Sequence, residues 1–163
     1  MAILKIIKES EDAAFLHRRS RPVSEITPRI RTLLDDMIET MRAADGCGLA
    51  AVQVGILRRV VVIETEPGRV YELINPEIIA RKGWQEEPEG CLSLPGESGI
   101  TRRPMTVTVR AQDRTGKEFE LTGSGLLARA ICHETDHLDG HLFTEVVIRP
   151  LGEEDAGKDG DDA

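Results

Sequence analysis

The 163-residue chain lacks a long uninterrupted run of apolar side chains. A membrane-spanning helix needs about 20 consecutive, mostly apolar residues, so we expect no transmembrane segment and no membrane partner. Residues 1–9 place lysines within a short apolar stretch and contain no small-residue cleavage site, which predicts that they are not a secretory signal. The length suits one domain with one core. Without a signal peptide, the sequence predicts that this domain lies in the reducing cytoplasm.

Cysteine is scarce, and positive charge is not in excess. Three cysteines, an odd number without a signal peptide, form no disulfide framework, so their thiols are available for metal or nucleophilic chemistry. The chain has 21 lysines and arginines against 29 acidic residues, a net charge of −8. Since nucleic-acid binding relies on clustered cations, we expect no direct nucleic-acid partner. Residues 152–163 contribute −5, so residues 1–151 carry only −3 and the exclusion is weaker there.

Sequence periodicity predicts a helix near the N-terminus. Thr27 is a suitable N-cap before Pro28, and apolar residues then recur at spacings of three and four. This pattern indicates a helix over about 28–44, with Gly46 as its stop.

Strand signals dominate the middle of the chain. Short β-branched or alternating segments are separated by turn residues without intervening helices, which favours antiparallel sheets and an α+β fold. The predicted strands cover residues 60–63, 70–79, 105–111 and 117–121. A second helix is expected from the N-cap Ser124 to about Leu138, with Gly140 as its stop. Residues 152–163 contain no large apolar side chain and are predicted to be a disordered acidic tail.

The second helix carries the motif His133-Glu134-Thr135-Asp136-His137. Two histidines at i and i+4 lie one turn apart on one helix face, so both imidazoles can reach the same metal. Leu126 and Ala130 share this stripe, which turns it toward the apolar interior, where Glu134 is suited to shuttle protons. The alternative is a helix with two incidental histidines.

A catalytic site of this kind needs a third protein ligand. One metallopeptidase pattern requires a further histidine, but Phe143 stands at that position and His141 does not. The other requires a glutamate on a following helix, and only the acidic tail remains downstream. Cys91, within Glu89-Gly90-Cys91-Leu92-Ser93, is the better candidate because a thiolate binds divalent transition metals strongly. Its alternative is a buried structural cysteine. A third segment, 46–53, combines small residues with Gln53, whose amide can donate to a carbonyl oxygen.

Taken together, the segments 46–53, 89–93 and 133–137 resemble the three signature motifs of peptide deformylases, in order and at familiar separations. The resemblance implies that antiparallel sheets pack around a central helix carrying the His-Glu-x-x-His motif, with an N-terminal helix before it. It implies a catalytic domain over 1–151, followed by the tail 152–163. It also implies a hydrolase that acts on a linear amide and releases formate from the N-terminal formyl-methionine of newly made polypeptides.

The resemblance further assigns roles to single residues. Cys91, His133 and His137 would bind one divalent metal, Fe²⁺ in most members, with Zn²⁺, Ni²⁺ and Co²⁺ suited to the same ligands. Hydroxide on this metal would attack the formyl carbon, and Glu134 would move the proton. The Gln53 amide and the Leu92 backbone N–H would stabilise the oxyanion. Residues implied to line the peptide or its methionine side chain are Cys47, Gly48, Gly90, Leu126 and Ala130.

Several features depart from the family pattern. Cys132 stands where glutamine is usual, and Val52 stands where proline or threonine is common. The helical wheel turns Cys132 away from the two histidines, so we do not expect it to be a ligand. The acidic tail differs from the basic C-terminal helix of better-known members, although the substrate still implies transient proximity to the ribosome. Two alternatives stay open: a catalytically silent paralogue that binds metal or peptide, and a small metallopeptidase.

Overall fold

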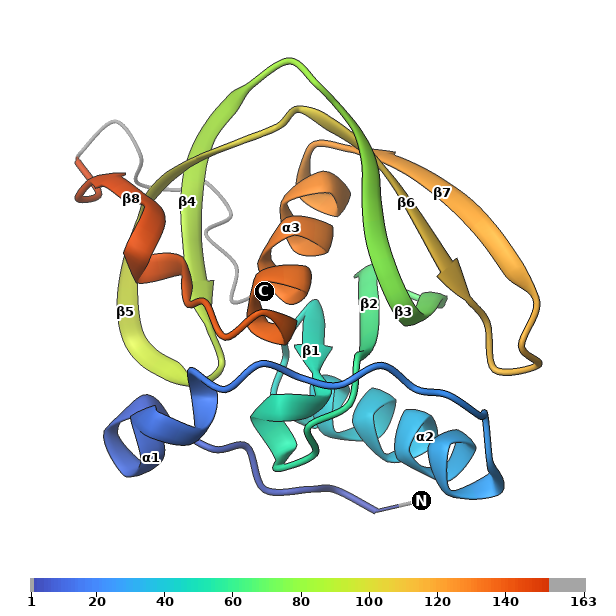
Figure 1. Ribbon diagram of the computed structural model, residues 1–163. Helices are drawn as coiled ribbons and strands as arrows, with labels where there is room; N and C mark the ends of the chain where they lie inside the picture. Colours follow the sequence, from blue (N-terminus) through green and yellow to red (C-terminus); the bar gives the residue numbers. More distant parts are fainter. Residues whose placement is uncertain (1, 153–163) are drawn as a thin grey trace.

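The computed structural model describes residues 2–152 and confirms an α+β fold with two antiparallel sheets around a central helix (Figure 1). The five-stranded sheet has the order β1-β2-β3-β6-β7, and the three-stranded sheet has the order β4-β5-β8. The strands are β1 (Gly48–Ala50), β2 (Val60–Glu66), β3 (Arg69–Lys82), β4 (Gln85–Cys91), β5 (Leu94–Arg103), β6 (Thr106–Gln112), β7 (Glu118–Ser124) and β8 (Val147–Arg149). The helices are α1 (Glu9–Leu16), α2 (Pro28–Ala43) and α3 (Leu126–Leu138), with short 3₁₀ turns η1 (Ala51–Val54) and η2 (Phe143–Val146). Within residues 2–152, every helix falls short of the length and apolar character that crossing a bilayer requires.

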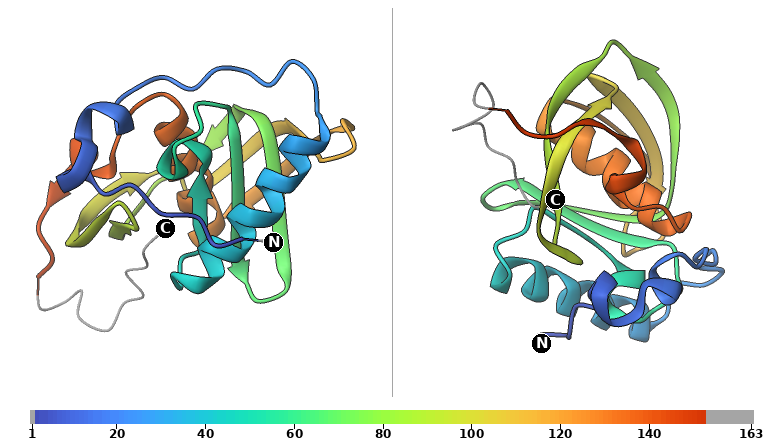
Figure 2. Two further views of the ribbon diagram at one scale, coloured as in Figure 1. Left: turned by 90° about the horizontal axis from the view of Figure 1, so that it is seen from below. Right: turned by 90° about the vertical axis from the view of Figure 1, so that its left-hand side faces the viewer.

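Strand β2 of the five-stranded sheet is buried on both faces. In β2, Val60 and Val62 face the apolar cluster that contains α2, whereas Val61 and Ile63 face the cluster that contains α3. A strand covered on both faces has no need for polar alternation, which explains the continuous β-branched run at 60–63. Figure 2 shows α2 on the side of this sheet opposite α3.

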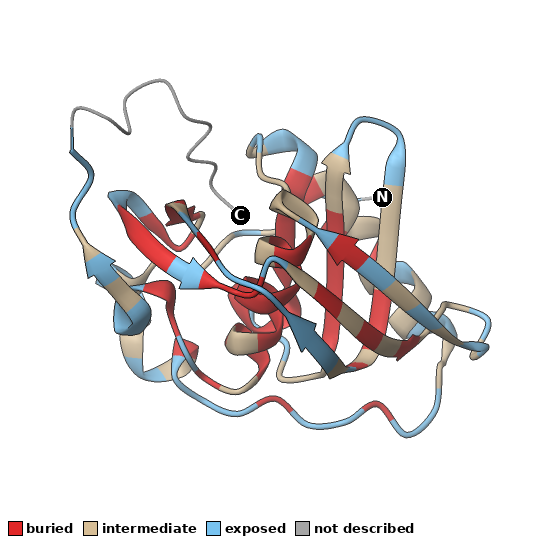
Figure 3. Ribbon diagram, turned by 90° about the horizontal axis from the view of Figure 1, so that it is seen from above, coloured by how far each residue is buried: buried red, intermediate tan, exposed pale blue. Residues whose placement is uncertain are grey.

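Two direct connections between strands lead from one sheet to the other, and they lie next to each other. The first lies at 83–84, between β3 and β4, and the second at 104–105, between β5 and β6. The Met105 N–H donates to the Gly83 carbonyl at 3.2 Å, so the connections lie side by side above α3. Gly83 has φ +68°, a backbone conformation that favours glycine. This arrangement places α3 between the sheets, and buried residues gather along it (Figure 3).

The predicted N-terminal helix is confirmed as α2, but its C-terminal end differs from the prediction. The Thr27 hydroxyl accepts the Ile30 N–H at 3.4 Å, so this residue is the N-cap. The helix ends at Ala43, and Asp45, with φ +57°, takes the left-handed position expected of Gly46. An aspartate tolerates this conformation better than most side chains, so Gly46 as the stop is wrong.

At α3, the predicted end is right and the predicted N-cap is wrong. Ser124 is the last residue of β7, where its hydroxyl hydrogen-bonds the Thr106 hydroxyl across the ladder at 2.8 Å. Strand pairing therefore takes up the group that would have capped the helix, and Gly125 precedes the first turn instead. Gly140, with φ +83°, follows the helix end as expected.

The four predicted strands are confirmed as β2, β3, β6 and β7, and the turns at 67–68 and 113–116 join them in pairs. Periodicity did not predict β1, β4, β5, β8 or α1. The predicted tail, 152–163, lies outside the described residues except for its first position.

Candidate metal centre

The buried face of α3 supplies two imidazoles and one carboxylate. His133 and His137 are 2% and 0% exposed, and Glu134 is 0% exposed, so the predicted orientation of the motif is confirmed. The spacing of four residues places the two rings one turn apart in an edge-to-face arrangement, with their centroids 4.9 Å apart. Phe143 of η2 stacks on His133, with a centroid distance of 6.1 Å. The local sequence therefore positions these side chains, and apolar packing closes the site.

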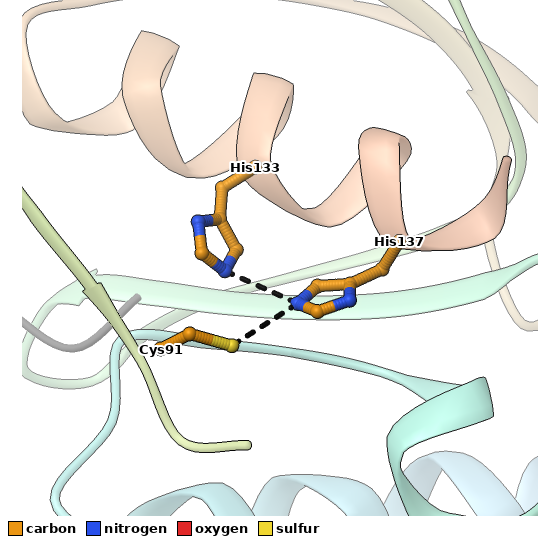
Figure 4. Close-up of side chains that lie close together, drawn as sticks. All are labelled: Cys91, His133 and His137. Atoms are coloured by element: carbon orange, nitrogen blue, oxygen red, sulfur yellow. Dashed lines mark hydrogen bonds between the residues drawn. The ribbon is translucent and has the colours of Figure 1, made fainter. Parts of the chain in front are cut away.

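Cys91, the last residue of β4, brings a sulfur to the same point (Figure 4). Its Sγ lies 3.3 Å from His137 Nε2, which lies 3.2 Å from His133 Nε2. Within residues 2–152, this is the group of buried donor atoms that could hold a metal ion, all within 4.8 Å of one another. One sulfur and two imidazole nitrogens form a donor set suited to a divalent transition metal. Cys91 is thus brought together with both histidines, as predicted.

The charges around these donors favour a cation. Burial and the neighbouring charge of His133 hold the pKa of His137 well below its ordinary value, so this ring keeps a lone pair. Burial opposes protonation of His133 too, but the nearby Cys91 and Glu134 raise its pKa well above the ordinary value. The surroundings of the His133 ring therefore stabilise a positive charge, and a bound metal ion would supply this charge in place of the proton. His137 Nδ1 has no hydrogen-bond partner among the described residues.

Glu134 is buried beside these donors, with neither carboxylate oxygen hydrogen-bonded within the described part of the chain. Burial raises its pKa to about 7, the range in which a carboxyl group can both take and give a proton near neutrality. Gly48 of β1 allows this placement, because a Cβ at that position would lie 2.5 Å from Glu134 Oε2. The first and third motifs therefore meet at a contact that only glycine permits.

Behind His133 lies a network of buried polar groups that the sequence did not reveal. Glu89 Oε2 lies 2.7 Å from His133 Nδ1, so the ring nitrogen donates to the carboxylate and its Nε2 faces the metal position. Arg103 donates to both oxygens of Glu89, at 3.1 and 2.7 Å, and Thr101 donates at 2.6 Å. These partners hold the pKa of Glu89 far below its usual range despite burial.

Asp136 completes this network. Its Oδ2 accepts from Arg103 Nη1 at 2.8 Å, whereas Arg102 stacks over the Trp84 ring at 4.4 Å. Asp136 therefore pairs with Arg103 and not with Arg102, the neighbouring arginine of β5. A signal for Glu89 was present: it stands two residues before Cys91, a spacing that places both side chains on one face of a strand.

Gln53, in η1, is also buried in the site. Its amide nitrogen donates to Ser93 Oγ at 3.0 Å and lies 3.6 Å from Cys91 Sγ, while its Oε1 accepts the Ala50 N–H. The amide N–H groups thus point toward the second motif. Leu92 packs against Gly46, where a Cβ would lie 2.6 Å from its side chain.

The remaining predicted positions lie on different elements. Cys47 is half-buried directly before β1, and Gly90 is buried in β4, paired with Ser98. On α3, Leu126 is half-buried in the first turn, whereas Ala130 is fully buried in the apolar cluster.

Cys132 lies on another face of α3 from the metal-binding donors, as the helical wheel predicts, and is not part of their group. Burial raises the pKa of its thiol to about 11, so it is protonated at neutral pH.

Comparisons with known proteins agree on one family. The family model described as polypeptide deformylase matches residues 3–151. A peptide deformylase of Alkaliphilus metalliredigens is 56% identical over 146 residues, covering 90% of this chain and 98% of that protein. The peptide deformylase structure from Legionella pneumophila has a TM-score of 0.84 at 40% identity, covering 94% of this chain and 89% of the other. The Thermotoga maritima structure has a TM-score of 0.85 at 32% identity, covering 90% and 99%.

Proposed function

The chain belongs to the peptide deformylase family, and we propose that it hydrolyses the formyl amide of N-formyl-methionyl peptides at Cys91, His133 and His137. The reaction releases formate and leaves a free amino terminus. The observation that carries this proposal is the convergence of three buried donor atoms beside Glu134, a buried carboxylate without a hydrogen-bond partner among the described residues.

The proposed cofactor is one divalent metal, Fe²⁺ in the native enzyme, held by the Cys91 sulfur and the Nε2 atoms of His133 and His137. When bound, such an ion supplies Lewis acidity and lowers the pKa of a water from 15.7 toward about 7. The donor set also suits Zn²⁺, Ni²⁺ and Co²⁺. Glu89 fixes the tautomer of His133, because its carboxylate accepts the proton on Nδ1.

Glu134 is the proposed general base and acid. Its carboxylate takes a proton from the attacking water and delivers it to the amine nitrogen as that group leaves. The pKa of about 7 suits both transfers near neutral pH. Because neither oxygen is tied to another side chain among the described residues, the group is available to substrate.

Gln53 and the Leu92 backbone N–H are the proposed donors to the oxyanion. The Gln53 amide already points toward Cys91 and Ser93, so its N–H groups border the position where the formyl oxygen would lie. Loss of one such donor typically costs about 10²–10³ in rate. Cys47, Gly48 and Gly90 are proposed to border the peptide backbone, and the methionine pocket is proposed to include Leu126 and Ala130.

We propose residues 1–151 as the catalytic domain and residues 152–163 as an acidic tail. The family match over 3–151 and the concentration of negative charge in the tail support this division. A cytoplasmic location and transient proximity to the ribosome follow from a substrate that is a newly made polypeptide. The position of Cys132 outside the donor group removes one reason to suspect a catalytically silent paralogue.

Formate release from a formyl-Met peptide by anaerobically purified, iron-loaded protein tests this proposal. Glu134→Gln should retain the metal, measured by mass spectrometry, and lose about 10²–10⁴ in turnover. Glu66→Gln, which changes an exposed carboxylate in β2, is the matched control and should keep full turnover. Full turnover in Glu134→Gln would contradict the assigned role, and an iron-replete wild type without formate release would contradict the function.

A further inference from the structure

A cavity of about 320 Å³ lies along α3 on another face from the metal centre. On the helix it is lined by Cys132, Thr135, Asp136 and Asp139, none of which belongs to the donor group. The other walls come from β3, from the end of β5, and from the segments before α2 and β2. In the proposed deformylation, no side chain that lines this cavity binds the metal or the substrate, and Arg103 reaches the metal centre only through Glu89.

The cavity is unusually rich in guanidinium groups. Three carboxylates also line it, those of Glu77, Asp136 and Asp139. The arginines are Arg19, Arg59, Arg81, Arg102 and Arg103. Charges of both signs could cancel within such a site, so the pairing of each group decides what the cavity can bind.

Two of the carboxylates are held in ion pairs by the deeper arginines. Asp139 pairs with Arg59 at 3.0 Å, and Asp136 pairs with Arg103 at 2.8 Å, although Arg103 also binds Glu89 behind the cavity. Arg19 reaches Asp139 only at 3.9 Å. These pairs fix the back of the cavity, so the positive charge left to attract an anion lies on the outer arginines.

Arg81 and Arg102 have no carboxylate within ion-pair distance in residues 2–152, and both side chains are exposed. Arg102 is held over the ring of Trp84 at 4.4 Å, which orients the plane of its guanidinium while its N–H groups stay available. Glu77 is exposed and is the one carboxylate of the cavity without an ion pair among the described residues. The unpaired charge of the cavity is therefore positive.

We propose that this cavity binds a phosphate group. Planar guanidinium groups match the oxygen geometry of phosphate through paired N–H donors, and a charge-assisted bond of this kind is stronger than a neutral one. A volume of about 320 Å³ accommodates a phosphate or pyrophosphate group, free or carried at the end of a nucleotide chain. The proposal is independent of the metal centre, because its variants lie outside the deformylation site.

Trp84 provides a local signal for the test. It is the single tryptophan of the chain, it is 60% exposed, and its ring contacts Arg102. Titration of metal-loaded protein with pyrophosphate at low ionic strength should therefore change its fluorescence saturably. Parallel titrations with inorganic phosphate and a short single-stranded RNA distinguish a free phosphate from one carried by a nucleotide chain. Tighter binding of RNA would identify a phosphate carried by a nucleotide chain. Binding of pyrophosphate alone would identify a free phosphate group.

Charge variants locate the binding. Arg81→Ala and Arg102→Ala should each weaken pyrophosphate binding about tenfold, the loss expected for a charge-assisted contact, with calorimetry used alongside fluorescence. Arg69→Ala removes the same charge at the other end of β3 and should leave affinity within twofold. Glu77→Gln should tighten binding, because it removes the unpaired carboxylate.

Formate release by these variants should stay at the wild-type level, which separates this proposal from the proposed function. No saturable binding of any phosphate probe by wild type would overturn the proposal. Equal affinity in the wild type and in the double variant Arg81→Ala/Arg102→Ala would overturn it as well, since the anion would then bind elsewhere.

Discussion

The two sheets enclose the same helix but bury different chemistry against it. The five-stranded sheet presents hydrocarbon to α3, from residues such as Val61, Ile63 and Leu73. In the three-stranded sheet, Glu89, Thr101 and Arg103 are buried together beside Cys91. Burial of ionic groups costs several kcal/mol unless each is paired and hydrogen-bonded, and here every oxygen of Glu89 has a partner.

Because of this difference, we expect the two sheets to contribute to different properties: one to the stability of the fold and the other to the metal centre. Apolar burial stabilises the fold wherever it occurs, whereas a buried ionic network is sustained only when its geometry is complete. We therefore expect substitutions in the five-stranded sheet to change the free energy of unfolding. Substitutions in the three-stranded sheet should change the metal centre in a protein that remains folded.

The largest effect is expected at Cys91. Cys91→Ser replaces the sulfur donor with a weaker ligand, so metal content and formate release should both collapse while the circular dichroism spectrum stays native. Cys132→Ser is the matched control, since it changes a buried thiol on the other face of α3, and it should retain the metal. Equal metal content in the two variants would remove Cys91 from the site.

Truncation of a core side chain in the five-stranded sheet should have the opposite effect to Cys91→Ser: stability should fall while the metal is retained. Leu73 of β3 is fully buried, so Leu73→Ala should lower the free energy of unfolding by about 2–5 kcal/mol through lost burial and a cavity. The protein that stays folded should keep its metal and its turnover per metal ion. Urea denaturation measures the first quantity, and active-site titration measures the second. Loss of metal at unchanged stability would contradict the division between the sheets.

A smaller effect is expected at Glu89. Glu89→Gln weakens the partner of His133 and should reduce metal affinity or activity about 10–100-fold, as is typical for groups behind a metal ligand. Glu86→Gln, an exposed position on the same strand, should have no effect on either quantity. Competition with a chelator measures metal affinity directly. An unchanged metal affinity in Glu89→Gln would show that the buried polar network around Glu89 supports only the fold and not the metal centre.

The smallest effect is expected at the ion pair between Arg42 of α2 and Glu64 of β2, in the five-stranded sheet. The hydrogen bond from Arg42 lowers the pKa of Glu64 below 4.5, and burial opposes this only partly. A lowered pKa contributes stability above the unfolded value, and this contribution is lost as the pH falls through the folded value. The difference in melting temperature between wild type and Glu64→Gln should therefore be greatest above about pH 4.5 and should disappear in acid. A difference independent of pH would contradict the assignment.

Local sequence was sufficient where a structure depends on near neighbours. Thr27 and Pro28 predicted the start of α2, and the spacing of His133 and His137 predicted a shared helix face. The strand at 60–63 was predicted from its β-branched residues alone. These features depend on backbone periodicity, which a single segment carries by itself.

The three-stranded sheet escaped prediction because it buries polar groups. Strand prediction relies on alternating or continuous apolar residues, and the sequence of β4, Gln-Glu-Glu-Pro-Glu-Gly-Cys, shows neither pattern. The end of β7 at Ser124 shows the same limit, because cross-strand pairing outweighed a good capping residue.

The sequence by itself determined the helix motif, the central strands and the set of residues that resembles the deformylase motifs. Only the tertiary structure decided that Glu89 supports His133 and that Arg103 joins Glu89 to Asp136. It also decided that Arg81 and Arg102 line a cavity with no ion pair to any carboxylate of residues 2–152. The physical reason is the separation along the sequence. Periodicity involves residues a few positions apart, whereas these contacts depend on strand register and on the connections between the two sheets. Charges that are ordinary in sequence acquire their partners, or lack them, only when those distant segments meet.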